Sequence, residues 1–373
     1  MLDPIVNFFT SIFQAIGRGI GLVIAWLLWP FMAFGRWYSR RGWLIKGPIG
    51  IGLILLVAFY AYFVWNTQVW SNFDPDYPDG YNLVNRNVSA GEQVNAANGD
   101  DTKTCGRSAI ADITIDLIDL NVNENAWISS MLLYKLGLFG VDWDHTPFLD
   151  NKASFQRGVN QAIRRTTVEL VDTLGRIRGT SQIDNNLQDA RGNMQFDEHT
   201  WYFGLNPFGP KTPTPSFYRS AMRDLRTFND RLEKCDAVFD ARADNLVQFL
   251  DRIASDIGST SAILRERFEN SNLGWFDTRA DDRFWFAYGQ LYAYYGIMSA
   301  TAADFEDVIK QRSIGPLFET TRQQFAAALK IRPFIISNGN ESGWIMPTHL
   351  ATMGFYVLRV RSNLVEIRQV LDR

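Results

Sequence analysis

Residues 47–65, GPIGIGLILLVAFYAYFVW, form a run of nineteen residues without a charged side chain. As a helix this run is about 28 Å long, close to the thickness of the hydrocarbon core of a bilayer. A core helix of a soluble protein usually has a polar face, and a cleavable signal peptide is shorter and ends in small residues. The run therefore predicts a transmembrane helix over residues 47–65.

The charges around this helix predict its direction. Arg36, Arg40, Arg41 and Lys46 precede it, and acidic residues follow it. Basic residues close to a membrane span stay on the cytoplasmic side, whereas acidic residues have little influence. The apolar run makes the lipid bilayer an expected partner of this chain. The flanking charges predict that residues 66–373 lie outside the cytosol.

Residues 1–46 form a second apolar segment that ends in the basic loop. No charge occurs in residues 19–35, but seventeen residues are close to the lower limit for a span, and Pro30 weakens a helix there. Two interpretations remain open, a second membrane helix or an interfacial segment in the inner leaflet, and the tryptophans at headgroup depth favour the second. Both leave the remainder of the chain outside.

Composition excludes some classes of function. The net charge of the chain is -3, and residues 1–65 sum to +4, so the remainder sums to -7 and offers no basic surface for nucleic acid. Cys105 and Cys235, the only cysteines, either form one disulfide in an oxidising compartment or remain two buried thiols. The spacing of cysteines and histidines fits no zinc site, and the sequence implies no cofactor.

Beyond the membrane segment the chain divides into two parts. Residues 66–104 are rich in Asn, Asp, Gly and Pro and predict a tether or an ordered extended arm, with residues 95–99 as its most mobile part. Residues 105–373 show helical periodicity almost throughout and predict an all-α, bundle-like domain. We expect helices over residues 108–120, 152–178, 216–239, 241–257 and 281–299, with a further short helix starting at Ser259 or Ser261.

Two of the predicted helices have unusual patterns. In the last helix the apolar residues follow a strict heptad spacing, which fits a helix docked in a bundle or a homodimer seam; they are Leu350, Met353, Val357, Val360, Leu364, Ile367 and Leu371. The helix over residues 281–299 carries aromatic side chains on all sides, so it lies in a core or presents a contact surface. The candidate surface residues are Trp285, Tyr288, Tyr292, Tyr294 and Tyr295.

Several short motifs resemble a known family. They are LDN at 149–151, FQRG at 155–158, LGR at 174–176, RADNL at 242–246, GSTS at 258–261, DDRF at 281–284, SNG at 337–339 and PTHL at 347–350. Together they resemble uncharacterised single-pass inner-membrane proteins of proteobacteria that share a domain of unknown function. The resemblance implies a bacterial inner-membrane location and a helical periplasmic domain, but no activity. Thr348, where the family tends to have asparagine, departs from it.

A few polar residues are candidates for chemistry. Asp281 and Asp282 begin the aromatic helix, where the helix dipole alone can account for two carboxylates. His349 follows Thr348 at the start of the last helix, and Ser342 lies nearby, but no GxSxG elbow is present. Asp197, Glu198 and His199 are consecutive, so they do not converge on one point.

These observations favour a non-enzymatic function. We expect a membrane-anchored periplasmic protein that acts as an interaction or assembly component of the cell envelope, with other envelope proteins or a second copy of itself as partner. The alternative is an envelope enzyme acting on peptidoglycan or lipid through Asp281, Asp282 and His349. A third interpretation is ligand binding in an aromatic pocket.

Overall fold

The computed structural model describes residues 3–83, 88–94, 104–138, 140–143, 146–176, 183–271, 273–343 and 345–373, with the backbone alone for residues 3–16 and Leu205. The chain divides into two compact units, Met1–Tyr62 and Phe63–Arg373. We call the second unit the helical domain. Residues 95–99, predicted to be the most mobile part of the arm, lie outside the described residues.

The first unit consists of two apolar helices, α1 (Asp3–Ser39) and most of α2 (Trp43–Gln68). The segments Gly17–Ser39 and Trp43–Gln68 are both long and apolar enough to cross a membrane. The predicted helix over residues 47–65 lies within α2, and α1 continues through Pro30 as a single helix. The Tyr38 hydroxyl donates a hydrogen bond to the Lys46 carbonyl oxygen (2.8 Å) and closes the loop between the helices.

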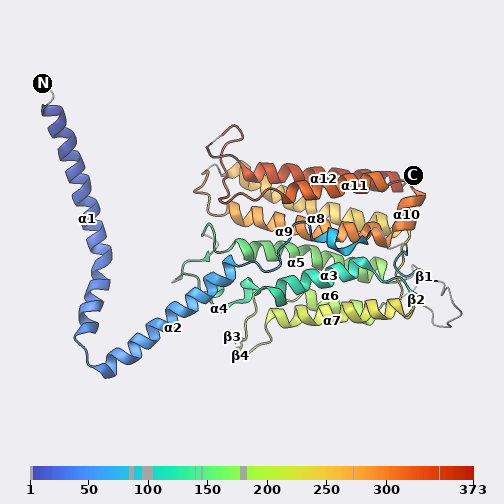
Figure 1. The fold of residues 1–373 in the computed structure, drawn as a ribbon, viewed down its shortest axis with the longest axis horizontal. Coiled ribbons are helices and arrows are strands. Elements are labelled where there is room, and N and C mark those ends of the chain that lie inside the picture. The colour runs from blue at the N-terminus through green and yellow to red at the C-terminus, as the bar shows by residue number, and fades with distance from the viewer. Residues whose placement is uncertain are drawn as a thin grey trace. The chain divides into compact units, whose positions relative to one another are not determined.

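The helical domain is built from helices that run along its length in layers (Figure 1). Its longer helices are α3 (Ala109–Asp119), α5 (Asn151–Glu169), α6 (Asn185–Met194), α7 (Thr214–Glu233), α8 (Ala243–Asn270), α9 (Ala280–Asp304), α11 (Gly315–Leu329) and α12 (His349–Leu371). Shorter elements are η1 (Tyr77–Tyr81), η4 (Ile128–Ser130), α4 (Leu132–Leu136), α10 (Glu306–Gln311) and the π-helical turns η3 (Leu120–Glu124) and η6 (Leu170–Leu174). The all-α fold class is confirmed.

Strands are confined to two short antiparallel pairs among the described residues. β1 (Gln93–Val94) pairs with β2 (Thr104–Cys105), and β3 (Phe203–Leu205) pairs with β4 (Phe208–Pro210) as a hairpin. Residues 334–337 belong to no strand, and the neighbouring Asn338 makes isolated bridges to Gly274 and Thr348.

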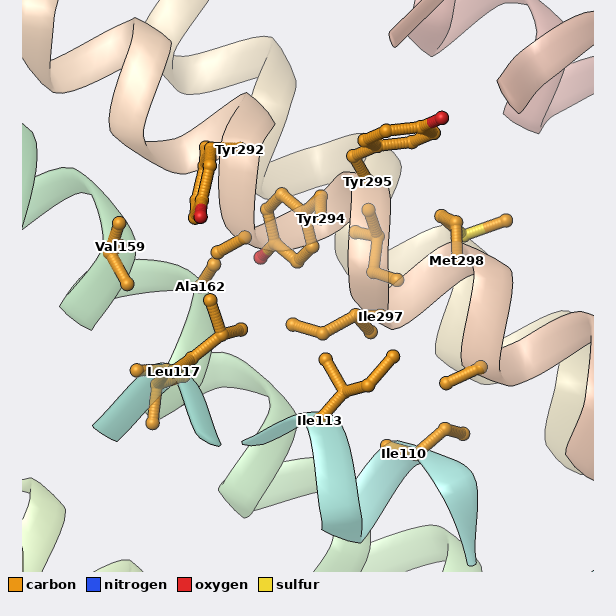
Figure 2. Packing of buried hydrophobic residues seen from close by; sticks show 14 of the residues in the cluster. Ile110, Ile113, Leu117, Val159, Ala162, Tyr292, Tyr294, Tyr295, Ile297 and Met298 are labelled. Carbon is orange, nitrogen blue, oxygen red and sulfur yellow. The ribbon is translucent and has the colours of Figure 1, made fainter. Parts of the chain in front are cut away.

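Helix α9 is the centre of the domain and packs against α3, α5, α8, α11 and α12. Figure 2 shows side chains of α3 and α5 meeting those of α9, which include Tyr292, Tyr294 and Ile297. The closest crossing is with α5, where Gly158 and Gly289 bring the two backbones together: a Cβ atom on Gly158 would lie 2.0 Å from the Phe286 carbonyl oxygen. Helix α9 carries aromatic residues on all its sides because other helices of the domain pack against it on all sides.

The interpretation of Trp285, Tyr288, Tyr292, Tyr294 and Tyr295 as an interaction surface was wrong, because each side chain is at most 9% exposed. Part of their cover is the chain that follows α2. In this arm, Phe73 stacks on Tyr292 (ring centroids 5.3 Å apart), Tyr77 stacks on the same ring (4.6 Å), and Trp70 contacts Trp285 (5.2 Å). Residues 66–104 were interpreted either as a tether or as an ordered arm. The part of this segment that the structure describes is an ordered arm.

The last helix, α12, is docked in the bundle, which was the first of the two interpretations of its heptad pattern. All seven heptad side chains of α12 are at most 4% exposed, and they face α8, α9 and α11. The Thr348 hydroxyl accepts a hydrogen bond from the Ala351 N–H and caps the helix.

Several helix boundaries differ from prediction: the helix predicted to end at residue 239 ends at Glu233, and the helix predicted to end at residue 299 continues to Asp304. The helix predicted to start at Ser216 starts at Thr214, because Pro215 suits the first turn. The helices predicted over residues 241–257 and from Ser259 are one helix, α8. The small residues there do not break it, because the Ser259 hydroxyl donates to the Asp256 carbonyl oxygen within the helix and Gly258 lies against Arg361 of α12.

The two cysteines form a disulfide between Cys105 of β2 and Cys235, just after α7. An ionic cluster lies beside it, because the Arg107 guanidinium bonds to Asp230 and Glu233 of α7 at 2.8 Å each. The start of α3 is also fixed by a buried carboxylate: Asp304 accepts hydrogen bonds from the Ser108 hydroxyl and the Ala109 N–H (2.7 Å each). These contacts tie the amino-terminal part of the domain to α7 and α9.

Candidate functional site

An open cleft of about 520 Å³ lies on the surface of the helical domain. We call it the α9–α11 cleft. The arm after α2 forms one wall, and the end of α9, the short helix α10 and the start of α11 form the others. Its lining residues are Pro78, Asp79, Asn82, Leu83, Met298, Ser299, Ala302, Ala303, Glu306, Ile309, Gly315, Phe318, Glu319 and Arg322.

The floor of the cleft is apolar. Met298 and Ala303 of α9 and Phe318 of α11 are buried, and Ala302 is half-buried beside them. The small alanine side chains leave room between α9 and α11, since larger ones at the same positions would fill it. The apolar side chains of the lining that remain partly exposed, such as Ala302 and Leu83, gain free energy when a complementary apolar group covers them.

The rim of the cleft is charged and organised around Arg322. Its guanidinium donates to Glu319 (2.8 Å), to Asp79 of the arm (3.1 Å) and to the Tyr295 hydroxyl (3.1 Å). The hydrogen bond from Arg322 lowers the pKa of Glu319 below its usual value. Glu306, on the opposite rim, forms an ion pair with Lys310. Three carboxylates, the Arg322 guanidinium and the Lys310 ammonium therefore lie at the rim, which leaves it a net charge of -1.

This combination suits binding. An apolar floor bordered by charged groups is the usual composition of a protein interface, with a water-excluding centre and a polar edge. The lining offers no nucleophile paired with a base, because the Ser299 hydroxyl donates to the Tyr295 carbonyl oxygen of its own helix. An occupant with an apolar face and basic flanks would match both the floor and the rim.

Asp281 and Asp282, two of the residues proposed for an enzyme, lie in the buried first turn of α9. Asp282 accepts a hydrogen bond from the Ser154 hydroxyl of α5 (2.6 Å). Burial, together with the charge of Asp282, raises the pKa of Asp281 to about 8, although the N–H groups of the helix start oppose this. Asp281 is therefore mainly protonated at pH 7, and with 3% exposure it is closed to substrate.

His349 belongs to a different network. Its ring Nδ1 atom accepts a hydrogen bond from the backbone N–H of Ser337 (2.9 Å), and the backbone N–H of His349 donates to the Ser337 carbonyl oxygen (2.9 Å). Burial lowers the pKa of this imidazole. The structure thus gives His349 a role in joining the start of α12 to the preceding loop, while Asp282 joins α9 to α5. The structure does not bring these residues together as a catalytic set.

The remaining polar candidates form no convergent set, although the His199 backbone N–H donates to the Asp197 carboxylate (3.1 Å). Asp197 accepts from the Thr200 hydroxyl, Glu198 forms an ion pair with Arg164 (2.8 Å), and the His199 ring stacks on Tyr134. Ser342 is exposed in the loop before α12. No group of His, Cys, Asp and Glu side chains that could hold a metal ion occurs within the described parts of the chain.

Sequence reasoning did not find the α9–α11 cleft. Asp79 and Arg322 are 243 residues apart, and neither belongs to a motif. Ala302 and Ala303 are small, but α9 has small residues along its whole length, so they give no distinct signal.

The fold and the preceding helices define the class of this protein: an all-α domain that follows two apolar helices of membrane-spanning length. The model of the family described as uncharacterized proteins conserved in bacteria, DUF2333, matches residues 109–275 and 269–373. The chain therefore belongs to the DUF2333 family, and the resemblance to an uncharacterised bacterial family is confirmed. No curated protein and no solved structure matches the chain.

Proposed function

We propose that this protein is a non-enzymatic assembly component of the bacterial cell envelope, anchored in the inner membrane and using the α9–α11 cleft to bind another envelope protein. The observation that carries the proposal is the open cleft, whose apolar lining is partly exposed at Ala302 and Leu83 and is bordered by charged side chains of net negative charge. Its walls come from four segments that are fixed by core packing, so the cleft is formed before a partner arrives and little ordering is needed on binding.

The location in this proposal is supported by two independent features. The basic loop between α1 and α2 favours a cytoplasmic position for that loop, and this supports a periplasmic position for the helical domain. The disulfide between Cys105 and Cys235 fits an oxidising compartment, where such bonds persist.

The chemistry of the cleft indicates the kind of partner. An amphipathic helix places apolar residues on one side and charged residues at its edges, and such helices commonly bind in apolar grooves. Lysine or arginine at the edges would face Asp79, Glu306 and Glu319 of the rim. We therefore infer that the partner supplies an amphipathic, basic helical segment.

Photo-crosslinking in cells tests this function. A photoreactive amino acid replaces Ser299, which lines the cleft, or Val238 in the connection between α7 and α8 as an exposed control. We expect a discrete protein adduct from position 299 and none from position 238. Mass spectrometry of the adduct should identify a basic amphipathic segment.

A second variant shows whether the cleft itself is used. Ala302→Trp should fill the cleft and remove the adduct from position 299 without changing the melting temperature. An adduct that persists in the Ala302→Trp background, or an absence of protein adducts at position 299, would contradict the proposal.

A further inference from the structure

One end of the helical domain carries exposed apolar side chains on four separate segments. These are the chain from α4 to α5, the β3–β4 hairpin, the connection between α8 and α9, and the connection between α11 and α12, which Figure 1 shows at the same end of the domain. We call this end the loop face. The opposite end carries α10, β1 and β2 (Figure 1).

Contacts between the segments confirm that they form one face. The Phe148 and Phe334 rings lie 5.8 Å apart, and Gly274 and Asn338 exchange backbone hydrogen bonds (3.1 Å each). The hairpin adjoins α4 because the His199 ring, just before β3, stacks on Tyr134.

The exposed side chains of the loop face are large. Phe334 is 88% exposed, Phe208 79% and Phe276 76%, and Leu273, Val141 and Ile345 are each more than half exposed. Large apolar groups on four loops are costly in water, and a concentration of them marks a surface that meets another apolar phase. Lys211, Lys330 and Arg332 are exposed among them, alongside Asp142 and Glu341.

The last turn of α2 is part of the same face. The Gln68 amide donates to the Phe148 carbonyl oxygen (2.8 Å), and Phe63, fully buried, packs on Trp143 with ring centroids 5.0 Å apart. Lys152, itself 3% exposed, donates from Nζ to the carbonyl oxygens of Asn66 (2.9 Å) and Val69 (2.6 Å), and so holds the end of the helix.

This docking leaves no spacer between the apolar run and the domain. The uncharged run extends to Trp65, whereas Phe63 already lies in the domain core. With a rise of about 1.5 Å per residue, a helix that leaves the hydrocarbon near Trp65 brings the loop face to the headgroup layer within a turn. A flexible linker would have allowed the domain to stand off the membrane.

We propose that the loop face itself inserts into the interfacial region of the bilayer that α2 crosses. This inference rests on the membrane anchoring in the proposed function, but not on the α9–α11 cleft. Continuity with α2 favours lipid as the occupant, because the chain that lies in the bilayer emerges through this face. Aromatic side chains and flanking lysines are the residue types that settle at headgroup depth.

The test measures lipid contact at single positions of the full-length chain. Phe276→Cys, Phe334→Cys and the control Val238→Cys are each labelled with an environment-sensitive fluorophore, while the native cysteines remain in their disulfide. The labelled chains are reconstituted into phosphatidylglycerol and phosphatidylcholine vesicles with or without lipids that carry a nitroxide quencher. We expect quenching at positions 276 and 334 to exceed that at position 238 at least threefold.

Three results would overturn the inference or its premise in distinguishable ways. Equal, weak quenching at all three positions would show that the loop face does not touch lipid. Blue-shifted emission at positions 276 and 334 without quenching would show that a second copy of the chain, and not lipid, covers the face. Extraction of the chain by alkaline carbonate would instead contradict the membrane anchoring on which both proposals depend.

Discussion

The crossing of α5 and α9 provides a sharp test of the domain core. At this crossing Gly158 faces the Phe286 carbonyl oxygen, and Gly289 faces the Phe155 carbonyl oxygen, at 2.0 and 2.1 Å from where a Cβ atom would lie. Backbone atoms cannot rotate away as a flexible side chain can. The change Gly158→Ala must therefore push the two helices apart by about 1 Å, which disturbs the packing around the most buried helix.

The expected cost follows from two opposing terms. Overpacking of a core typically costs about 1 to 3 kcal/mol, and contact with backbone places this site at the upper end. Alanine in a helix gains up to about 1 kcal/mol over glycine. We expect a net loss of about 2 kcal/mol, and a fall in melting temperature of roughly 3 °C.

The assay compares full-length variants in detergent by circular dichroism at one scan rate. Gly354→Ala is a matched control, because it is also a helical glycine but has no atom within 4 Å of the added Cβ. The control should melt at or slightly above the wild-type temperature. If Gly158→Ala melts as high as Gly354→Ala, the close packing of α5 on α9 is wrong.

Further predictions concern the buried carboxylate and the disulfide. Because the pKa of Asp281 is raised to about 8, the folded state binds more protons than the unfolded state between about pH 4 and 8, and this residue lowers stability progressively as pH rises through that window. Asp281→Asn should therefore stabilise the domain at pH 8, by at most about 5 kcal/mol, and raise its melting temperature. The gain in stability should shrink toward pH 5, and a gain that does not depend on pH would contradict the assignment. Loss of the Cys105–Cys235 bond, which joins positions 130 residues apart, should cost up to about 5 kcal/mol, so Cys105→Ser and Cys235→Ser should each destabilise the domain, and the double variant no further than either.

Much of the architecture could be predicted because it depends on local patterns. The uncharged run over residues 47–65 predicts a helix from its own sequence alone, and α2 contains the whole run. The heptad spacing from Leu350 to Leu371 requires one apolar face, and that face is buried. The capping role of Thr348 depends on local sequence, because its hydroxyl accepts a hydrogen bond from the Ala351 N–H only three residues away.

The parts that could not be predicted depend on contacts between distant segments. Nothing local to Phe73 or Tyr77 indicates that they stack on Tyr292, more than 200 residues later. Aromatic residues on α9 therefore looked equally suited to a surface or a core until the covering arm was known. For the same reason the α9–α11 cleft, whose rim joins Asp79 to Arg322, has no signature in either segment.

The side of the membrane on which the helical domain lies is the central claim, and reporter fusions to Arg373 test it most directly. Alkaline phosphatase is active only after export, whereas green fluorescent protein exported in the unfolded state does not fluoresce. We predict active phosphatase and a dark fluorescent fusion at comparable expression. A bright fluorescent fusion with inactive phosphatase would place the domain in the cytosol and contradict the account.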